Sequence, residues 1–376
     1  MIKKQDIKAF AHNFLIISLI IICVFLIFKD QTIVSTSVAK GLSMCVNIII
    51  PSLFPFMIIC NFINLSPIVK IVSKLFSPIT RFIFRMPEKT GSLIFMSFIG
   101  GYPTGSKMIS DAISIGNISA ELGDVLLCFC VNAGPAFVIT SIGYLMLGSK
   151  RIGLLLLFSH ILGSIIIGII LGARSKNKYL NKDIKNQKWT SLPYSEAFVK
   201  SVIDSGYAVL NICCFVIIFW VITNLIKGHL HISSLLYKDI FYTVLSLLEI
   251  TVGMNDIVKI NGFISILISS FLISFSGISV ICQVFFFMSG HKFNKNKFIV
   301  FRIFHGLISS IITAILINFV GDIQYTLATT IFDPKIELYT ISPFMSLVIL
   351  ALSLNFIMFT YNEIIQSNYF IASKNI

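Results

Sequence analysis

The amino-acid sequence predicts an all-α protein that crosses a membrane several times, and three observations support this prediction. Hydrophobic residues make up 56% of the 376 positions and charged residues only 12%, about half the charged fraction of an ordinary globular protein. The charges are grouped between apolar runs of about 20 residues, the length that an α-helix needs to cross the hydrocarbon core of a bilayer. Glycine- and proline-rich motifs interrupt several of these runs. The mean hydropathy of +0.93 fits a chain whose solvent is lipid.

Eight apolar runs are long enough to be transmembrane helices. They are residues 10–28, 46–63, 125–147, 153–173, 202–226, 262–288, 298–320 and 343–359. The first run also resembles a signal peptide, because basic residues precede an apolar core. We expect it to be retained, since the small-residue motif Ser37-Val38-Ala39 lies far beyond the run.

Two weaker apolar stretches, residues 91–115 and 240–257, are interpreted as re-entrant hairpins. The first contains the motif Gly100-Gly101-Tyr102-Pro103-Thr104-Gly105-Ser106-Lys107. Proline lacks the backbone N–H and glycine leaves the backbone free, so a helix is expected to unwind here. Unwound backbone inside a membrane persists only where protein encloses it or where it lines a watery cavity. Such a break is therefore a candidate binding site for a polar solute.

The net charge of +13 is explained by the positions of the loops. Lysine and arginine concentrate before residue 9 and in residues 70–89, 174–200 and 292–302. Basic residues mark cytoplasmic loops, and all these segments share one side if both termini are cytoplasmic. Nucleic acid is not expected as a partner, because these loops lack the interleaved aromatic residues of nucleic-acid binders.

This topology divides the chain into two similar halves of opposite orientation. Each half reads span, hairpin, span, span, but the first hairpin enters from the cytoplasm and the second from the outer face. Inverted repeats with discontinuous helices are typical of secondary transporters. The predicted units are an amino-terminal helix with an outer loop (1–45), a first repeat (46–173), a basic cytoplasmic linker (174–199), a second repeat (200–320), and an outer loop with a carboxy-terminal helix (321–376).

The second break, Asn132-Ala133-Gly134-Pro135, interrupts the run 125–147. On its own it is equally compatible with a proline kink in an ordinary helix. The half-helices that begin at Pro103 and Pro135 direct positive dipole ends toward the breaks, and Lys107 adds a full charge. Helix amino termini of this kind attract anions.

In the second half, Glu249 is the one acidic residue of the run 240–250. A carboxylate at that depth is a functional candidate. It carries a coupling proton or cation, or it forms a structural ion pair with Lys107, and the sequence leaves both interpretations open. Asp256 and Lys259 are interpreted as an interfacial pair. The predicted substrate site comprises Gly101, Tyr102, Pro103, Thr104, Gly105, Ser106, Lys107, Asn132, Gly134, Pro135, Thr251, Ser276, Gly277, Ser279 and Gln283, with Glu249 as the coupling or ion-pair residue.

Several classes of function lack support in the sequence. The eight cysteines contain no CxxC pair, the six histidines contain no HExxH motif, and no GxxxxGK[ST] phosphate-binding loop occurs. No carboxylate dyad or nucleophile motif is evident either. We therefore expect no metal, no cofactor and no enzymatic activity.

Several motifs resemble the YlbJ family of sporulation integral membrane proteins, which carry the nucleoside-recognition Gate domain. The likeness spans about residues 47–320 and rests on Pro51-Ser52-Leu53-Phe54-Pro55-Phe56, residues 75–87, 101–107, 132–137 and 248–251, and the run 274–279 with Gln283. The resemblance implies transport of dipicolinic acid across the outer forespore membrane. It equally implies a shared module with nucleoside transporters.

The expected partners are a small organic anion (dipicolinate) and the lipid bilayer, and a homo-oligomer is compatible with the sequence. Dipicolinate is a planar dianion, and helix amino termini with hydroxyls, Asn132 and Lys107 suit two carboxylates. Nucleosides are neutral and would depend on amides and on aromatic stacking at Tyr102 and Phe137. Nucleoside transport, or an assembly role in the spore membrane without transport, remain the alternatives.

Overall fold

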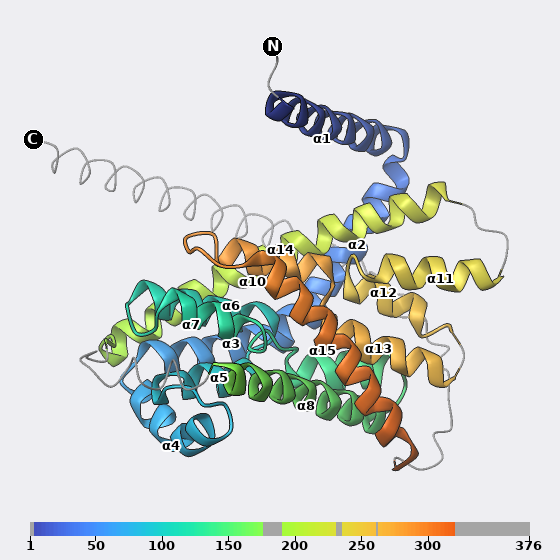
Figure 1. Ribbon diagram of the computed structural model, residues 1–376. Coiled ribbons are helices and arrows are strands. Elements are labelled where there is room, and N and C mark those ends of the chain that lie inside the picture. Colours follow the sequence, from blue (N-terminus) through green and yellow to red (C-terminus); the bar gives the residue numbers. More distant parts are fainter. Residues whose placement is uncertain (1–3, 176–189, 231–234, 261, 320–376) are drawn as a thin grey trace, which may run out of the picture. The chain divides into compact units, whose positions relative to one another are not determined.

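The computed structural model describes residues 4–175, 190–230, 235–260 and 262–319, which consist of helices and connecting loops without a strand (Figure 1). Five helical runs are long and apolar enough to cross a membrane, namely Gln31–Leu65, Lys150–Arg174, Tyr194–His229, Phe263–Phe287 and Lys295–Leu316. The prediction of an all-helical fold with several candidate membrane spans is confirmed for the described residues. The predicted span 343–359, the carboxy terminus and most of the basic linker lie outside the described residues.

The amino-terminal part begins with α1 (Lys4–Lys29) and continues as one long helical run. This run consists of α2 (Gln31–Met44), the π-helical turn η1 (Cys45–Ile49) and α3 (Ile50–Leu65), so the predicted span 46–63 starts earlier than expected. It packs along the 36-residue helix α10 (Tyr194–His229). Gly41 allows this contact, because a Cβ atom there would lie 3.2 Å from Ile217, and small residues let membrane helices approach closely.

Residues 70–89, expected as a cytoplasmic connecting segment, contain a helix of their own. Helix α4 (Ile68–Phe82) buries Val69, Ser73, Ser77 and Thr80 and exposes Ile71, Leu75 and Phe82. A helix with basic residues beside exposed apolar ones is typical of a segment that lies in the membrane interface. A 3₁₀ turn, η2 (Glu88–Thr90), leads from it into α5 (Gly91–Ser97).

All four interruptions predicted from the sequence are present. Helix α5 stops at Ser97, and α6 (Tyr102–Ser114) starts after Gly101, whose φ of +85° few side-chain-bearing residues adopt. The second break separates α7 (Ala120–Leu127) from the π-helix η3 (Phe137–Met146). In the second half, α11 (Leu235–Ser246) is followed by α12 (Ile250–Ile257), and α13 (Phe263–Phe275) by α14 (Gly277–Phe287).

Two uninterrupted helices pack against these broken ones. They are α8 (Lys150–Arg174) and α15 (Lys295–Leu316), which is followed by the 3₁₀ turn η4 (Ile317–Phe319). Helix α8 contacts η3 and α15, and α15 also contacts α13. Gly143 and Gly153 bring α8 and η3 together, because a Cβ on Gly143 would lie 2.4 Å from the Cα of Gly153. The buried core surrounds the breaks, with Leu126, Phe129, Val131 and Ile273 almost completely enclosed.

Helix α8 permits a direct test of the predicted orientation. Its 25 residues span about 37 Å, so its two ends should face opposite sides of the membrane. In a cysteine-free background, we expect an impermeant thiol reagent added from the cytoplasmic side to label Ser175→Cys and not Ser149→Cys. Adding the reagent from the other side should reverse the result. Labelling of both from one side would contradict the topology on which the inverted repeats depend.

Candidate functional site at the helix breaks

In each half of the protein the two breaks lie against each other. A Cβ on Gly101 would lie 3.8 Å from the backbone nitrogen of Gly134, so the first and second breaks are in contact. In the second half, the backbone N–H of Ile278 donates to the carbonyl of Leu247 at 2.8 Å, and that of Ser279 to Leu248 at 2.9 Å. The same pairing of breaks is therefore built into both halves.

Arg302 on α15 joins the breaks of the two halves. Its Nη1 donates to the carbonyl of Val131 at 2.6 Å, its Nε to that of Phe275 at 3.3 Å, and its Nη2 to that of Ser274. Ser274 and Phe275 end α13, where carbonyls have no partner within the helix and where a positive charge is favourable. The guanidinium group thus caps the carboxy terminus of α13. It also donates a hydrogen bond to the second break, at Val131.

The charge of Arg302 is unusual in this position. The side chain is 0% exposed, and within the described residues it forms no ion pair with a carboxylate. Burying a cation without an anionic partner is unfavourable, and an ionisable group inside a membrane protein is a functional candidate. From the sequence, Arg302 was counted with the basic residues of a cytoplasmic segment, but the residue lies about two turns inside α15, where it is buried.

His160 on α8 joins the same two breaks a second time. Its Nε2 accepts from the backbone N–H of Ala133 at 3.0 Å, and its Nδ1 lies 2.9 Å from the hydroxyl of Ser274. The ring of His305 stacks on it, with centroids 4.6 Å apart, and His305 Nε2 lies 2.8 Å from the His160 carbonyl oxygen. Sequence reasoning considered these histidines only as metal ligands.

A signal for this cluster was present in the sequence. The pattern His-x-Leu-x-Ser occurs once in α8, as His160-Ile161-Leu162-Gly163-Ser164, and once in α15, as His305-Gly306-Leu307-Ile308-Ser309. These helices follow the second break of their respective halves. A comparison of the two halves with each other would have selected both histidines.

Residues 101–106 of the first break are buried, and their hydroxyl groups have partners within the protein. The Tyr102 hydroxyl donates to the carbonyl of Ile273 at 2.6 Å, and its ring meets Phe137 edge-on. The Thr104 hydroxyl donates to Gly100 at 2.6 Å, and that of Ser106 to Pro103 at 2.8 Å. The hydroxyl groups therefore stabilise the start of α6 in this conformation.

Two predicted amides at the breaks are only partly satisfied. Asn132 Nδ2 donates to the Phe129 carbonyl at 2.9 Å and to Ser97 Oγ at 3.2 Å, while its Oδ1 has no partner. Gln283 Nε2 donates to Ser279 Oγ at 3.4 Å, while its Oε1 has none. Buried polar atoms normally have partners, so these two acceptors mark the places where a donor from a ligand or a water would fit.

The proposed ion pair between Lys107 and Glu249 is wrong. Lys107 Nζ lies 2.7 Å from Asp111 and 3.2 Å from Asp204 on α10, and Lys200 reaches the same Asp204 carboxylate at 3.4 Å. The charge of Lys107 is therefore balanced by carboxylates that the sequence analysis had not connected with it.

Glu249 is instead the N-cap of α12. One of its oxygens accepts from the backbone N–H of Val252 at 2.8 Å and from the hydroxyl of Thr251 at 2.5 Å, and Trp220 Nε1 donates to the same Thr251 hydroxyl at 3.0 Å. A carboxylate at a helix amino terminus is stabilised by backbone N–H groups and by the helix dipole. The predicted pair of Asp256 and Lys259 is confirmed, at 3.4 Å.

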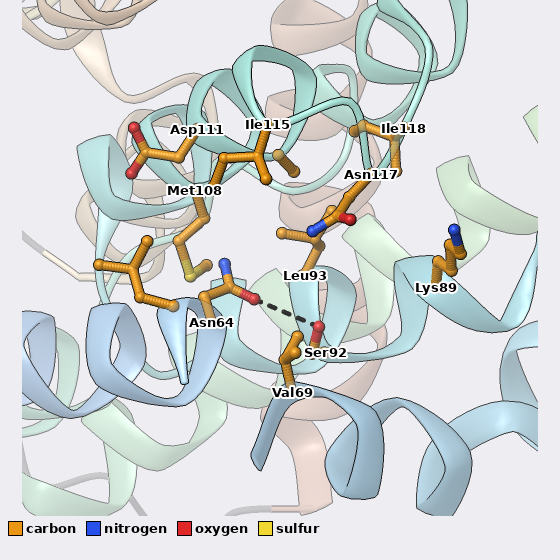
Figure 2. Close-up of a pocket in the computed structure, with 12 residues that line it drawn as sticks. Asn64, Val69, Lys89, Ser92, Leu93, Met108, Asp111, Ile115, Asn117 and Ile118 are labelled. Atoms are coloured by element: carbon orange, nitrogen blue, oxygen red, sulfur yellow. Dashed lines mark hydrogen bonds between the residues drawn. The ribbon is translucent and has the colours of Figure 1, made fainter. Parts of the chain in front are cut away.

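A small cavity lies beside α6, away from the breaks (Figure 2). Its volume is about 20 Å³, enough for about one water molecule. Asn64, Lys89, Ser92, Asp111 and Asn117 provide its polar lining, and Ser92 donates to Asn64 at 3.2 Å. Within the described part of the chain, no group of three or more His, Cys, Asp or Glu side chains is placed to hold a metal ion.

The first break depends on the absence of a side chain at Gly105. A Cβ there would lie 1.8 Å from the carbonyl oxygen of Cys130, so α6 contacts the second break backbone to backbone. We expect Gly105→Ala to lower the free energy of unfolding by about 1–3 kcal/mol or more. The control is Gly206→Ala in α10, where nothing lies within 4 Å, and which should be neutral or stabilising. Equal thermal stability of the two variants in detergent would contradict this packing.

The separate roles of Glu249 and Lys107 can be measured with a double-mutant cycle. Glu249→Gln should destabilise the protein by about 1 kcal/mol through the weakened cap. Lys107→Gln should destabilise it independently, because Asp111 and Asp204 lose their shared cation. The two effects on the free energy of unfolding should add within about 0.5 kcal/mol. If the double variant recovered the stability of the wild type, this result would support a direct ion pair between Lys107 and Glu249.

Comparison with known proteins adds one relationship. No protein-family model and no solved structure matches the chain. The sporulation integral membrane protein YlbJ of Bacillus subtilis (strain 168) is 25% identical to it over an alignment that covers 80% of this chain and 83% of the relative. The resemblance noted in the sequence motifs thus extends along most of the chain. This protein is a homologue of the sporulation integral membrane protein YlbJ.

Proposed function

We propose that this protein is a sporulation membrane transporter that moves dipicolinic acid, a small organic dianion, across the outer forespore membrane. One observation carries the proposal, namely the buried guanidinium of Arg302 at the point where the helix breaks of both halves meet. The name of the related protein supports a role in a sporulation membrane.

The proposed architecture has eight crossings with both termini in the cytoplasm, two re-entrant hairpins, and two inverted repeats of the Gate type. The order of interrupted and continuous helices supports it, because α5 to α8 and α11 to α15 follow the same sequence of elements. Transporters with such repeats bind their substrates near the middle of the membrane, at the interface between the repeats. The residues that contact Arg302 come from both halves.

The chemistry of the cluster favours an anion. The guanidinium carries a fixed positive charge and presents a planar set of donors that matches a carboxylate in a bidentate arrangement. Its present partners are neutral carbonyls, which a carboxylate would replace with a stronger, charge-assisted interaction. The helices that begin at Tyr102 and Gly277 add the positive ends of their dipoles.

The site is closed in this conformation. Arg302, His160, Asn132 and Ser274 are all 0% exposed, so a solute reaches them only after the helices around the breaks separate. Alternating access requires such an enclosed state between the two open ones. Backbone breaks held by side chains from neighbouring helices are suited to this movement, because side-chain hydrogen bonds can be exchanged without unfolding a helix.

Two alternatives make different predictions. Nucleoside transport would use the aromatic faces of Tyr102 and Phe137, but these rings pack on each other, and the Tyr102 hydroxyl is engaged. A purely structural role in a spore-membrane assembly is favoured by the internal partners of Lys107 and Glu249. Uptake of labelled dipicolinate by liposomes containing the purified protein separates transport from assembly, and competition by nucleosides tests the first alternative.

Substitution of Arg302 tests the assigned anion group. We expect Arg302→Lys, which keeps the charge and loses the planar fork, to reduce dipicolinate uptake by about tenfold or more, since charge-assisted hydrogen bonds contribute about 1.5–3 kcal/mol each. The matched control is Lys295→Gln at the exposed start of the same helix, which should transport normally. Unchanged uptake by a stably folded Arg302→Lys protein would remove Arg302 from the site.

A further inference from the structure

The stacked pair His160 and His305 has a hydrogen-bond pattern that fixes both rings. A carbonyl oxygen only accepts, so His305 Nε2, which contacts the His160 carbonyl at 2.8 Å, carries its hydrogen. The Ala133 N–H only donates, so His160 Nε2 is bare, and His160 Nδ1 carries the hydrogen that it donates to Ser274. Both nitrogens of His160 are therefore satisfied in the neutral ring.

His305 differs from His160 at one atom. Its Nδ1 is a bare nitrogen in the neutral ring, it is buried, and it has no hydrogen-bond partner. A proton added to His160 would disrupt the contact with Ala133, whereas a proton added to His305 Nδ1 disrupts no hydrogen bond. Of the two rings, His305 is the one arranged to accept a proton.

The charged and titratable groups around His305 determine when a proton can bind to its Nδ1. Arg302 lies one helical turn before His305, and residues three apart on a helix are neighbours. His160 faces it from α8, while α13, which also packs against α15, contains no titratable side chain. Tyr102 and Cys128 face Arg302, and no carboxylate of the described residues pairs with either ring. A second buried cation beside Arg302 therefore needs an added anion.

We propose that His305 takes up one proton when a dianion binds at Arg302, so that anion transport is coupled to protons. This inference rests on the proposed function. The guanidinium and the protonated imidazole together carry two positive charges, which balance the two carboxylates. Binding of each ligand then promotes binding of the other, as linkage requires. Glu249, which caps α12, is not the coupling group in this scheme.

The test compares exchange with accumulation in proteoliposomes. His305→Gln keeps a donor for the His160 carbonyl but removes the proton-accepting nitrogen. We expect it to exchange labelled dipicolinate at equal pH more weakly than the wild type, because one of the two balancing charges is lost, and at a rate that no longer depends on pH. Its accumulation under a gradient of one pH unit should fall by about tenfold, the value of one coupled proton. His291→Gln, outside the buried cluster and bonded to Ser110 and Ser114, should behave as wild type.

A second measurement does not depend on any variant. Dipicolinate added to the wild-type protein in weakly buffered detergent solution should remove about one proton from the medium for each dianion bound. Binding without proton uptake, or wild-type accumulation by His305→Gln, would overturn the coupling while leaving the transport proposal intact. Failure of the wild type to bind or exchange dipicolinate at all would overturn the proposed function and, with it, this inference.

Discussion

The constraint on which this structure depends is that backbone groups freed inside a membrane must find partners within the protein. Four helices stop at the breaks within the buried core, and each stop releases carbonyl and N–H groups that need partners. Arg302 donates hydrogen bonds to the carbonyls of Val131, Ser274 and Phe275, and His160 accepts a hydrogen bond from the N–H of Ala133. Two side chains from the uninterrupted helices thus hold the interruptions of both halves together.

The same hydrogen bonds leave an unbalanced positive charge at the centre of the protein, which would attract an anion. Carbonyl oxygens satisfy a guanidinium group but do not neutralise it, so the cluster keeps a net positive charge in an enclosed site. Several half-buried charges elsewhere in the described chain are paired with opposite charges, as in the network of Lys107 with Asp111 and Asp204 and in the pair of Lys227 with Asp256. This contrast separates the site at the breaks from the ion pairs that hold helices together.

The sequence predicted the breaks well because their causes are local. Gly101 adopts a positive φ, Pro103 and Pro135 lie in the first turns of new helical segments, and Gly277 follows the left-handed Ser276. Such residues terminate or start helices through their own covalent geometry, so no knowledge of the neighbours is needed. Apolar length likewise pointed to the five long helical runs, because the thickness of the bilayer is fixed.

The partners of the charged residues could not be predicted in the same way. One of the two open interpretations paired Lys107 with Glu249. Yet Asp204 reaches Lys107 from a helix about a hundred residues away, and Glu249 finds its partners within three residues. Arg302 looked like a loop cation because it lies close to Lys292 and Lys297 in the sequence. The burial of Arg302 depends on where α15 enters the core. The hydropathy of a single sequence does not show that position.

The sequence by itself determined that this protein is helical, that it crosses a membrane, and where its helices unwind, since these follow from residue chemistry acting over a few positions. Only the tertiary structure showed that the charged side chain at the breaks is Arg302. The reason is physical: the environment of a buried charge is set by the groups that surround it. Here those groups come from the break after α7 and from α8, α13 and α15, which the chain brings together over more than 170 residues.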